Sequence, residues 1–168
     1  MIDCIKSEQY ISKHREETQE VLCNFTQTDL LLFWSDNPNV YAGQQKLWQP
    51  FIDSLQAESK QKLSISESLQ IPNNEPYLLW LKNSLQKFSD KEMTAVFLVA
   101  SLTKSVILGL SILKEKTSVE NIYTAAFWEE IYQNKLWGTD EEALQRREQI
   151  KTELQKIWEY LYKRKVRI

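Results

Sequence analysis

The sequence predicts a single all-α domain, and three observations on its 168 residues carry that prediction. The chain has only 3 glycines and 4 prolines, whereas a sheet-rich domain needs many tight turns. Apolar residues recur at helical spacing through most of the chain. A chain of this length with 42% hydrophobic residues can form one domain with a substantial core and is short for two. We therefore expect residues 1–168 to form one multi-helix domain.

The N-terminal part predicts an amphipathic helix followed by a short capped run. Residues 2–25 distribute apolar side chains among charges and leave the middle of the segment polar. Thr28-Asp29 then offers an N-terminal cap for the apolar run at residues 30–34.

Helical spacing continues in the next segments. Residues 40–55 place apolar side chains on one helical face, and Pro50 lies inside that pattern. Because proline removes a donor and clashes with the preceding turn, Pro50 should start a fresh helix or kink a continuous one. Residues 62–66 are expected to form at most a very short extended segment, and residues 77–88 a further helix.

The most apolar stretch, residues 93–113, is expected to be a central core helix. It could be mistaken for a membrane span, but Lys104 lies near its middle. A lysine at mid-membrane costs roughly 2.5–3.5 kcal/mol, whereas a helix that is apolar on most sides suits the centre of a soluble bundle. We therefore expect no membrane insertion.

Two capping boxes predict the C-terminal helices. Thr117-Ser-Val-Glu120 should begin a helix that ends at the Gly138 C-cap. Thr139-Asp-Glu-Glu142 should begin a long C-terminal helix that extends through Leu161.

The charge balance gives no sign of a nucleic-acid or membrane partner. A net charge of −2, from 21 basic and 23 acidic residues, provides no field that would steer the chain toward either. The basic segment Lys163-Arg-Lys-Val-Arg167 is a local exception. We interpret it as a cationic complement to the C-terminal end of a helix dipole, with an RNA or membrane contact as the alternative.

The cysteines indicate a reducing compartment. Cys4 and Cys23 are the only two, which is too few for a disulfide framework. The N-terminus has neither the apolar core of a signal peptide nor the composition of a transit peptide. We expect the bacterial cytoplasm, with the mitochondrial matrix as the alternative.

No residue pattern indicates catalysis, and an enzyme is the least supported class. His14 is the only histidine and has no carboxylate or cysteine cluster beside it, and Cys23 has no local histidine partner. The three glycines are too scattered to form a phosphate loop or a dinucleotide turn. We therefore predict no catalytic residue, no cofactor-binding residue and no metal ligand.

The segment from Phe127 to Gly138 carries more aromatic surface than a helix corner needs. Trp128, Tyr132 and Trp137 lie beside the carboxylate pair Glu129-Glu130. Without catalytic chemistry nearby, such a corner is either part of the core or a surface for another protein.

This corner resembles a known family. Glu129-Glu130-Ile-Tyr132-Gln133-x-x-x-Trp137-Gly138 resembles the Glu-Glu-x-(Tyr/Trp)-Gln-x-x-x-Trp-Gly segment of the ATP-synthase F(1)-sector assembly chaperones of the Atp-twelve (Atp12) family. Three further segments resemble the family in the same order along the chain: Thr28-Asp29-Leu30-Leu31, Gln44-x-x-x-Trp48-Gln49-Pro50 and Lys104-Ser105.

The chain also departs from the family pattern. Gln49 replaces the usual aspartate, and residues 32–34 replace a Cys-Tyr-Arg-like run. Residues 1–3 fall where the helical part of family members would begin, so the family's smaller N-terminal α/β region is expected to be absent. Residues 1–168 then correspond to the helical C-terminal domain.

The resemblance implies a non-catalytic chaperone. It would hold the free ATP synthase α subunit, prevent its aggregation and release it when the α subunit pairs with the β subunit; we expect the free chaperone to be a monomer. The residues implied in α-subunit binding are the anchors Trp128, Tyr132 and Trp137 and the rim residues Glu129, Glu130 and Gln133.

Some of these residues also have a purely structural interpretation, and the chain has alternative functions. Trp137 is expected to pack inside the corner, Trp48 is expected to be core, and either glutamate could be an ordinary solvated residue. A helical adaptor or remnant module with another partner remains the alternative function. A nucleic-acid-binding helical domain, which rests only on the basic C-terminal segment, is less favoured.

Overall fold

The computed structural model describes residues 1–163 and confirms the all-α prediction for that part of the chain. The α-helices, in chain order, are α1 (Cys4–Lys13), α2 (Arg15–Asn24), α3 (Pro38–Ser59), α4 (Glu75–Lys87), α5 (Asp90–Thr103), α6 (Val106–Ser111), α7 (Val119–Ala126), α8 (Trp128–Trp137) and α9 (Glu141–Tyr162). Two 3-10 turns, η1 (Phe25–Gln27) and η2 (Leu30–Leu32), join α2 to α3. The short extended segment expected near residues 62–66 is confirmed by a parallel β-bridge between Phe33 and Ser66.

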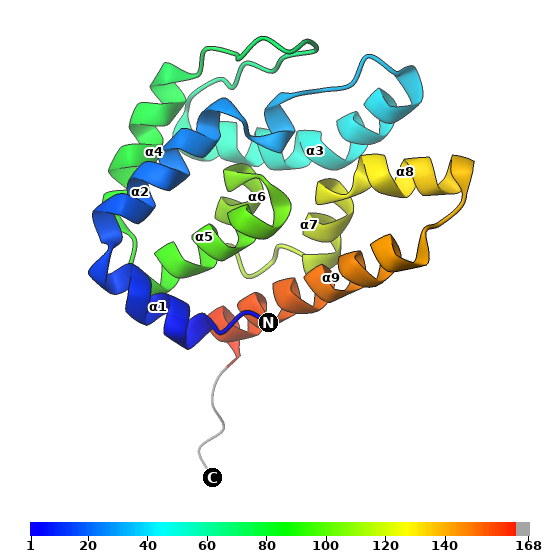
Figure 1. Cartoon of the computed structure of the whole chain (residues 1–168). Helices are drawn as coiled ribbons and strands as arrows, with labels where there is room; N and C mark the ends of the chain where they lie inside the picture. Colours follow the sequence, from blue (N-terminus) through cyan, green and yellow to red (C-terminus); the bar gives the residue numbers. More distant parts are fainter. Residues whose placement is uncertain (164–168) are drawn as a thin grey trace.

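The helices form a ring around α5 and α6 (Figure 1). α3 crosses one side of the ring, α9 runs along the opposite side, and α1, α2 and α4 close one end. α5 and α6 supply the centre of the core, and most of their residues from Met93 to Leu110 are buried. The central core position predicted for residues 93–113 is therefore confirmed.

The prediction of one continuous helix over residues 93–113 is wrong, because the chain breaks at Lys104. This residue adopts the left-handed conformation, with φ 64° and ψ 27°, and ends α5. α6 then begins after Ser105, whose hydroxyl accepts a hydrogen bond from the Leu108 N–H at 3.1 Å. The break places Lys104 at the surface in the middle of an apolar stretch. Within residues 1–163, no helix has the length and apolar character needed to cross a membrane.

Asp29 explains why the break is stable. Its carboxylate is fully buried and accepts hydrogen bonds from the Leu31 N–H and the Ile107 N–H, both at 3.1 Å. The Leu30 N–H also donates to the Lys104 carbonyl at 3.0 Å. Asp29 therefore caps η2, as the sequence predicts, and also caps α6 through Ile107, which is 78 positions further along the chain.

Two other predicted helices are also divided. Residues 2–25 were expected to form one helix, but His14, with φ −127° and ψ 39°, separates α1 from α2. The helix expected to end at Gly138 is broken at Phe127, with φ −113° and ψ 16°, into α7 and α8. In contrast, α3 continues through Pro50 over its full 22 residues.

The two predicted capping boxes are wrong by one residue. Ser118, rather than Thr117, caps α7 by accepting a hydrogen bond from the Asn121 N–H. Asp140, rather than Thr139, caps α9 by accepting one from the Glu142 N–H. In both cases a serine or aspartate, which is at least as good a cap as threonine, follows the predicted residue. The Gly138 C-cap is confirmed, with φ 87°. Of the basic segment at residues 163–167, residues 164–167 lie outside the described residues.

Burial raises the pKa of Asp29 from 3.8 to about 6, although hydrogen bonds from Ser105, Ile107, Leu31 and Val106 lower it. Between these two pH values the folded chain retains the Asp29 proton and the unfolded chain releases it. The stability that this proton contributes is complete below about pH 3.8 and is lost as the pH rises through about 6.

We therefore predict that wild-type protein loses stability relative to Asp29→Asn between pH 4 and pH 7. The relative loss in free energy of unfolding should be on the order of 3 kcal/mol, because the variant has no group that titrates at this position. Urea unfolding of both proteins at several pH values, followed by circular dichroism, measures it. A difference that stays constant across this range would contradict the prediction.

Candidate functional site

The α8–α9 corner, residues 128–144, projects from one edge of the ring (Figure 1). No residue of α8 is fully buried, in contrast to α5 and α6. Such a helix needs specific attachments to keep its orientation, because little apolar burial holds it in place.

Trp128 attaches α8 to α3. Its indole N–H donates a hydrogen bond to the Val40 carbonyl at 3.0 Å, and the side chain is half-buried. A Cβ at Gly43 would lie 2.0 Å from two carbon atoms of the indole ring, so the absence of a side chain at Gly43 makes room for the ring. Tyr132, also half-buried, packs on Trp128 with ring centroids 5.8 Å apart. Both rings therefore serve the internal packing of α8.

Arg147 connects α8 to α9. It is only 4% exposed, and its Nε lies 3.9 Å from Oε1 of Glu130. Glu130 also pairs with the exposed Arg146 at 3.6 Å. When the Asn134 amide oxygen faces Arg147, it accepts hydrogen bonds from both terminal guanidinium nitrogens, at 2.9 and 3.3 Å. The half-buried Glu130 is thus part of a polar contact that fixes the angle of the corner.

The residues left free at the corner are on its outer side. Glu129 and Gln133 are exposed, and within the described residues Glu129 forms no ion pair. Trp137 is 85% exposed, so the expectation that it packs inside the corner is wrong. Where the chain leaves α8 at Gly138, a Cβ would meet no atom of the described residues within 4 Å.

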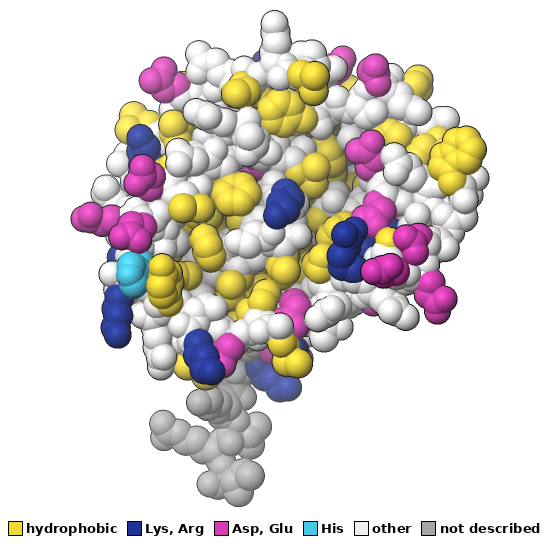
Figure 2. Space-filling view, in the orientation of Figure 1, with side chains coloured by type: hydrophobic (Ala, Val, Ile, Leu, Met, Phe, Trp, Pro, Cys, Tyr) yellow, Lys and Arg dark blue, Asp and Glu magenta, His cyan; other side chains and the backbone are white. Residues whose placement is uncertain are grey.

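Leu136, which precedes Trp137 in α8, and Leu144, in the first turn of α9, are further exposed apolar residues of the corner. They are 57% and 37% exposed, and Figure 2 shows hydrophobic side chains at this edge of the molecule, near carboxylates. Asp140, Glu141 and Glu142 are exposed on the chain between them. Sequence reasoning did not single out either leucine for binding; the position of Leu136 next to Trp137 was the one available signal.

This arrangement is suited to binding through apolar contacts. One corner carries an exposed tryptophan, two exposed leucines, and exposed carboxylates and an amide, the residue types that make the apolar centre and polar rim of a protein interface. Within residues 1–163 there is no group of three or more His, Cys, Asp or Glu side chains that could hold a metal ion.

Several residues of the other segments that resemble the family are buried and hold elements together. Asp29 and Ser105, from two of these segments, meet at the N-terminus of α6. Trp48 is 2% exposed, which confirms it as core, and its indole N–H donates to the Ala125 carbonyl of α7 at 2.8 Å. The buried Gln44 accepts a hydrogen bond from the Ser35 N–H at 2.8 Å. The Trp48 hydrogen bond positions α7, which precedes α8, on α3.

Comparison with known proteins gives structural matches only. No protein-family model matches the sequence, and no curated protein matches it. Atp12 from Paracoccus denitrificans superposes with a TM-score of 0.83 and 22% identity, over 92% of this chain and 69% of that chain. The D202K mutant of the same protein gives a TM-score of 0.85 and 23% identity, over 93% and 68% of the two chains.

A third solved structure, the Atu1473 protein from Agrobacterium tumefaciens, gives a TM-score of 0.81 and 23% identity. The match covers 90% of this chain and 57% of that chain. The resemblance to the Atp12 family that the four sequence segments indicate is therefore confirmed at the level of the fold: over about nine-tenths of its length, this chain has the fold of Atp12.

Proposed function

We propose that the chain is an assembly chaperone for the catalytic head of ATP synthase, and that its α8–α9 corner binds the free α subunit before this pairs with the β subunit. The fold of Atp12 supports the proposal, and so does the description of the Atu1473 protein as a proposed chaperone. The observation that carries it is the exposure of Trp137, which lies in the sequence segment that most resembles the family.

The physical requirement for such a chaperone is an apolar surface that can cover another one and later be displaced. Trp137 and Leu136 are exposed at 85% and 57%, so binding can bury both side chains without rearranging the core. The surrounding carboxylates favour a partner surface with basic groups at its rim and oppose self-association of the corner.

The six residues expected to bind the partner fall into two groups of three by their exposure. Glu129, Gln133 and Trp137 are exposed and available for direct contact. Trp128, Tyr132 and Glu130 are half-buried and contact α3, each other or α9, so we propose that they act by orienting the corner.

We further propose that residues 1–168 correspond to the helical C-terminal domain of the family and that this domain is sufficient to bind the α subunit. The matches cover 57–69% of the solved chains, so the shared fold does not decide whether this domain alone binds the α subunit. The bacterial cytoplasm remains the expected location. Affinity capture that recovers another stoichiometric protein and no α subunit would favour the adaptor alternative instead.

Truncation of the exposed apolar residues should weaken binding without affecting the fold. We predict that the double variant Trp137→Ala/Leu136→Ala raises the Kd for the α subunit at least about tenfold, since exposed aromatic anchors carry much of an interface's energy. The free energy of unfolding should change by less than about 0.5 kcal/mol. Titration calorimetry and urea unfolding measure the two quantities.

Leu79→Ala provides the matched control, because Leu79 is 62% exposed on α4, away from the corner. It should leave both quantities unchanged. Equal binding by the corner variant and the control would remove the proposed role of the corner.

Charge reversal should have different effects on stability at Glu129 and at Glu130. Glu129→Lys should raise the Kd about fivefold, mainly through slower association, and leave stability unchanged, because Glu129 is exposed and has no ion-pair partner among the described residues. Glu130→Lys should also lower the free energy of unfolding by about 1–3 kcal/mol, because it places a second cation beside the buried Arg147.

Surface plasmon resonance and urea unfolding test this pair, with the exposed loop residue Glu67 changed to lysine as the control. The assignment is wrong if Glu129→Lys destabilises the fold as much as Glu130→Lys does.

A further inference from the structure

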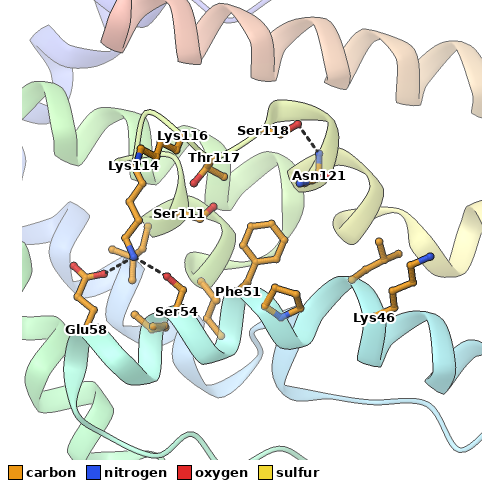
Figure 3. Close-up of a pocket in the computed structure, with 15 residues that line it drawn as sticks. Lys46, Phe51, Ser54, Glu58, Ser111, Lys114, Lys116, Thr117, Ser118 and Asn121 are labelled. Carbon is orange, nitrogen blue, oxygen red and sulfur yellow. Dashed lines mark hydrogen bonds and ion pairs between the residues drawn. The ribbon is translucent and has the colours of Figure 1, made fainter.

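A groove separate from the α8–α9 corner lies between α3 on one side and the segment from α6 to the start of α7 on the other (Figure 3). Its cavity volume is about 320 Å³, which is within the range of small binding pockets. None of its lining residues belongs to residues 128–144, so the corner does not account for it. We refer to it as the lysine groove, after Lys46, Lys114 and Lys116 on its walls.

The floor of the lysine groove is apolar and open to solvent. Leu47, Pro50 and Phe51 of α3 lie along it, with Leu110 of α6 at the opposite side. Leu47 and Phe51 are only half-buried and Pro50 is exposed, so a ligand can cover apolar area that the fold leaves in water.

Pro50 also changes the backbone at this floor. A residue at this position of α3 would normally donate its N–H to the carbonyl of Lys46, four residues earlier, but proline has no N–H. The Lys46 carbonyl therefore lacks its usual helical donor, and Lys46 and Pro50 both line the groove. A donor from a bound ligand, such as a peptide N–H, can supply the missing hydrogen bond.

The walls carry positive charge. Lys114 reaches across the groove to Glu58, at 3.5 Å, and to the Ser54 hydroxyl, at 2.6 Å (Figure 3). Lys46 and Lys116 are exposed and form no ion pair within the described residues. The N-terminus of α7, capped by Ser118, opens on the same groove and adds the positive end of a helix dipole. Glu58 is the one carboxylate among the lining residues.

We propose that the lysine groove binds an extended acidic segment of a protein partner, with an apolar side chain on the Leu47–Phe51 floor and carboxylates facing Lys46 and Lys116. From Lys46 to Glu58 the α3 wall is about 18 Å long at 1.5 Å per residue, which matches about five extended residues. The proposal is independent of which protein binds at the α8–α9 corner.

The composition of the groove favours a peptide over a nucleic acid. Backbone phosphates are usually held by a continuous track of cations, whereas here Glu58 interrupts the positive wall and three apolar side chains occupy the floor. An acidic peptide matches the lysines, the apolar floor and the Lys46 carbonyl, since it supplies carboxylates, an apolar side chain and backbone N–H donors.

The test uses the full chain and a pool of blocked pentapeptides with Asp or Glu at both ends and Leu or Phe in the middle. We expect the pool to shift NMR signals of groove residues and to select binders whose affinity falls with added salt. Lys46→Glu/Lys116→Glu should weaken these binders at least about tenfold, since two attractions become repulsions. A pool with Lys at both ends should bind this variant better than it binds the wild type.

Lys62→Glu/Lys82→Glu carries the same charge change at exposed positions outside the groove and should not alter peptide affinity. Trp137→Ala should not alter it either, so this result is separate from the function proposed for the corner. The proposal is overturned if the acidic pool does not bind, if binding is the same in the Lys46→Glu/Lys116→Glu variant, or if a polyuridine oligonucleotide binds the groove more tightly than every acidic peptide.

Discussion

The buried carboxylate of Asp29 is the interaction on which the arrangement of the helices depends. It accepts N–H donors from η2 and from the first turn of α6, and so fixes the turn before α3 against the break between α5 and α6. That break divides the central apolar stretch and places Lys104 at the surface. Without the carboxylate, each buried N–H would lack an acceptor at a cost of about 1–3 kcal/mol. The ring of outer helices packs on the centre that this contact defines.

From this centre, two tryptophans determine where the α8–α9 corner lies. Trp48 joins α3 to the end of α7 through the Ala125 carbonyl, and Trp128 joins α3 to the start of α8 through the Val40 carbonyl. Most of the residues behind the family resemblance therefore serve the fold. Trp137 differs from them, because it is exposed and no hydrogen bond or ring contact within residues 1–163 ties it to another element. A partner-binding role is the physical reason we propose for an apolar side chain of this size in that position.

Local patterns predicted which segments are helical, the Gly138 C-cap, the core position of Trp48 and the short extended segment near residues 62–66. They did not predict the breaks at His14, Lys104 and Phe127, because the periodicity of each segment is compatible with one longer helix. At Lys104 and Phe127 the break accompanies a distant contact, with Asp29 and with α3 respectively. Trp137 was misplaced for a related reason: whether another element covers a helix end is decided by tertiary packing and has no local signal.

We propose that the interior motifs position the α8–α9 corner and leave its outer side for the partner. Hydrogen–deuterium exchange of the full chain, with and without the ATP synthase α subunit, tests it most directly. We expect slower exchange for the amides of α8 and of the first turn of α9 in the complex, with α1, α2 and α4 unchanged. Slower exchange confined to α1, α2 or α4, with α8 exchanging at its free rate, would contradict it.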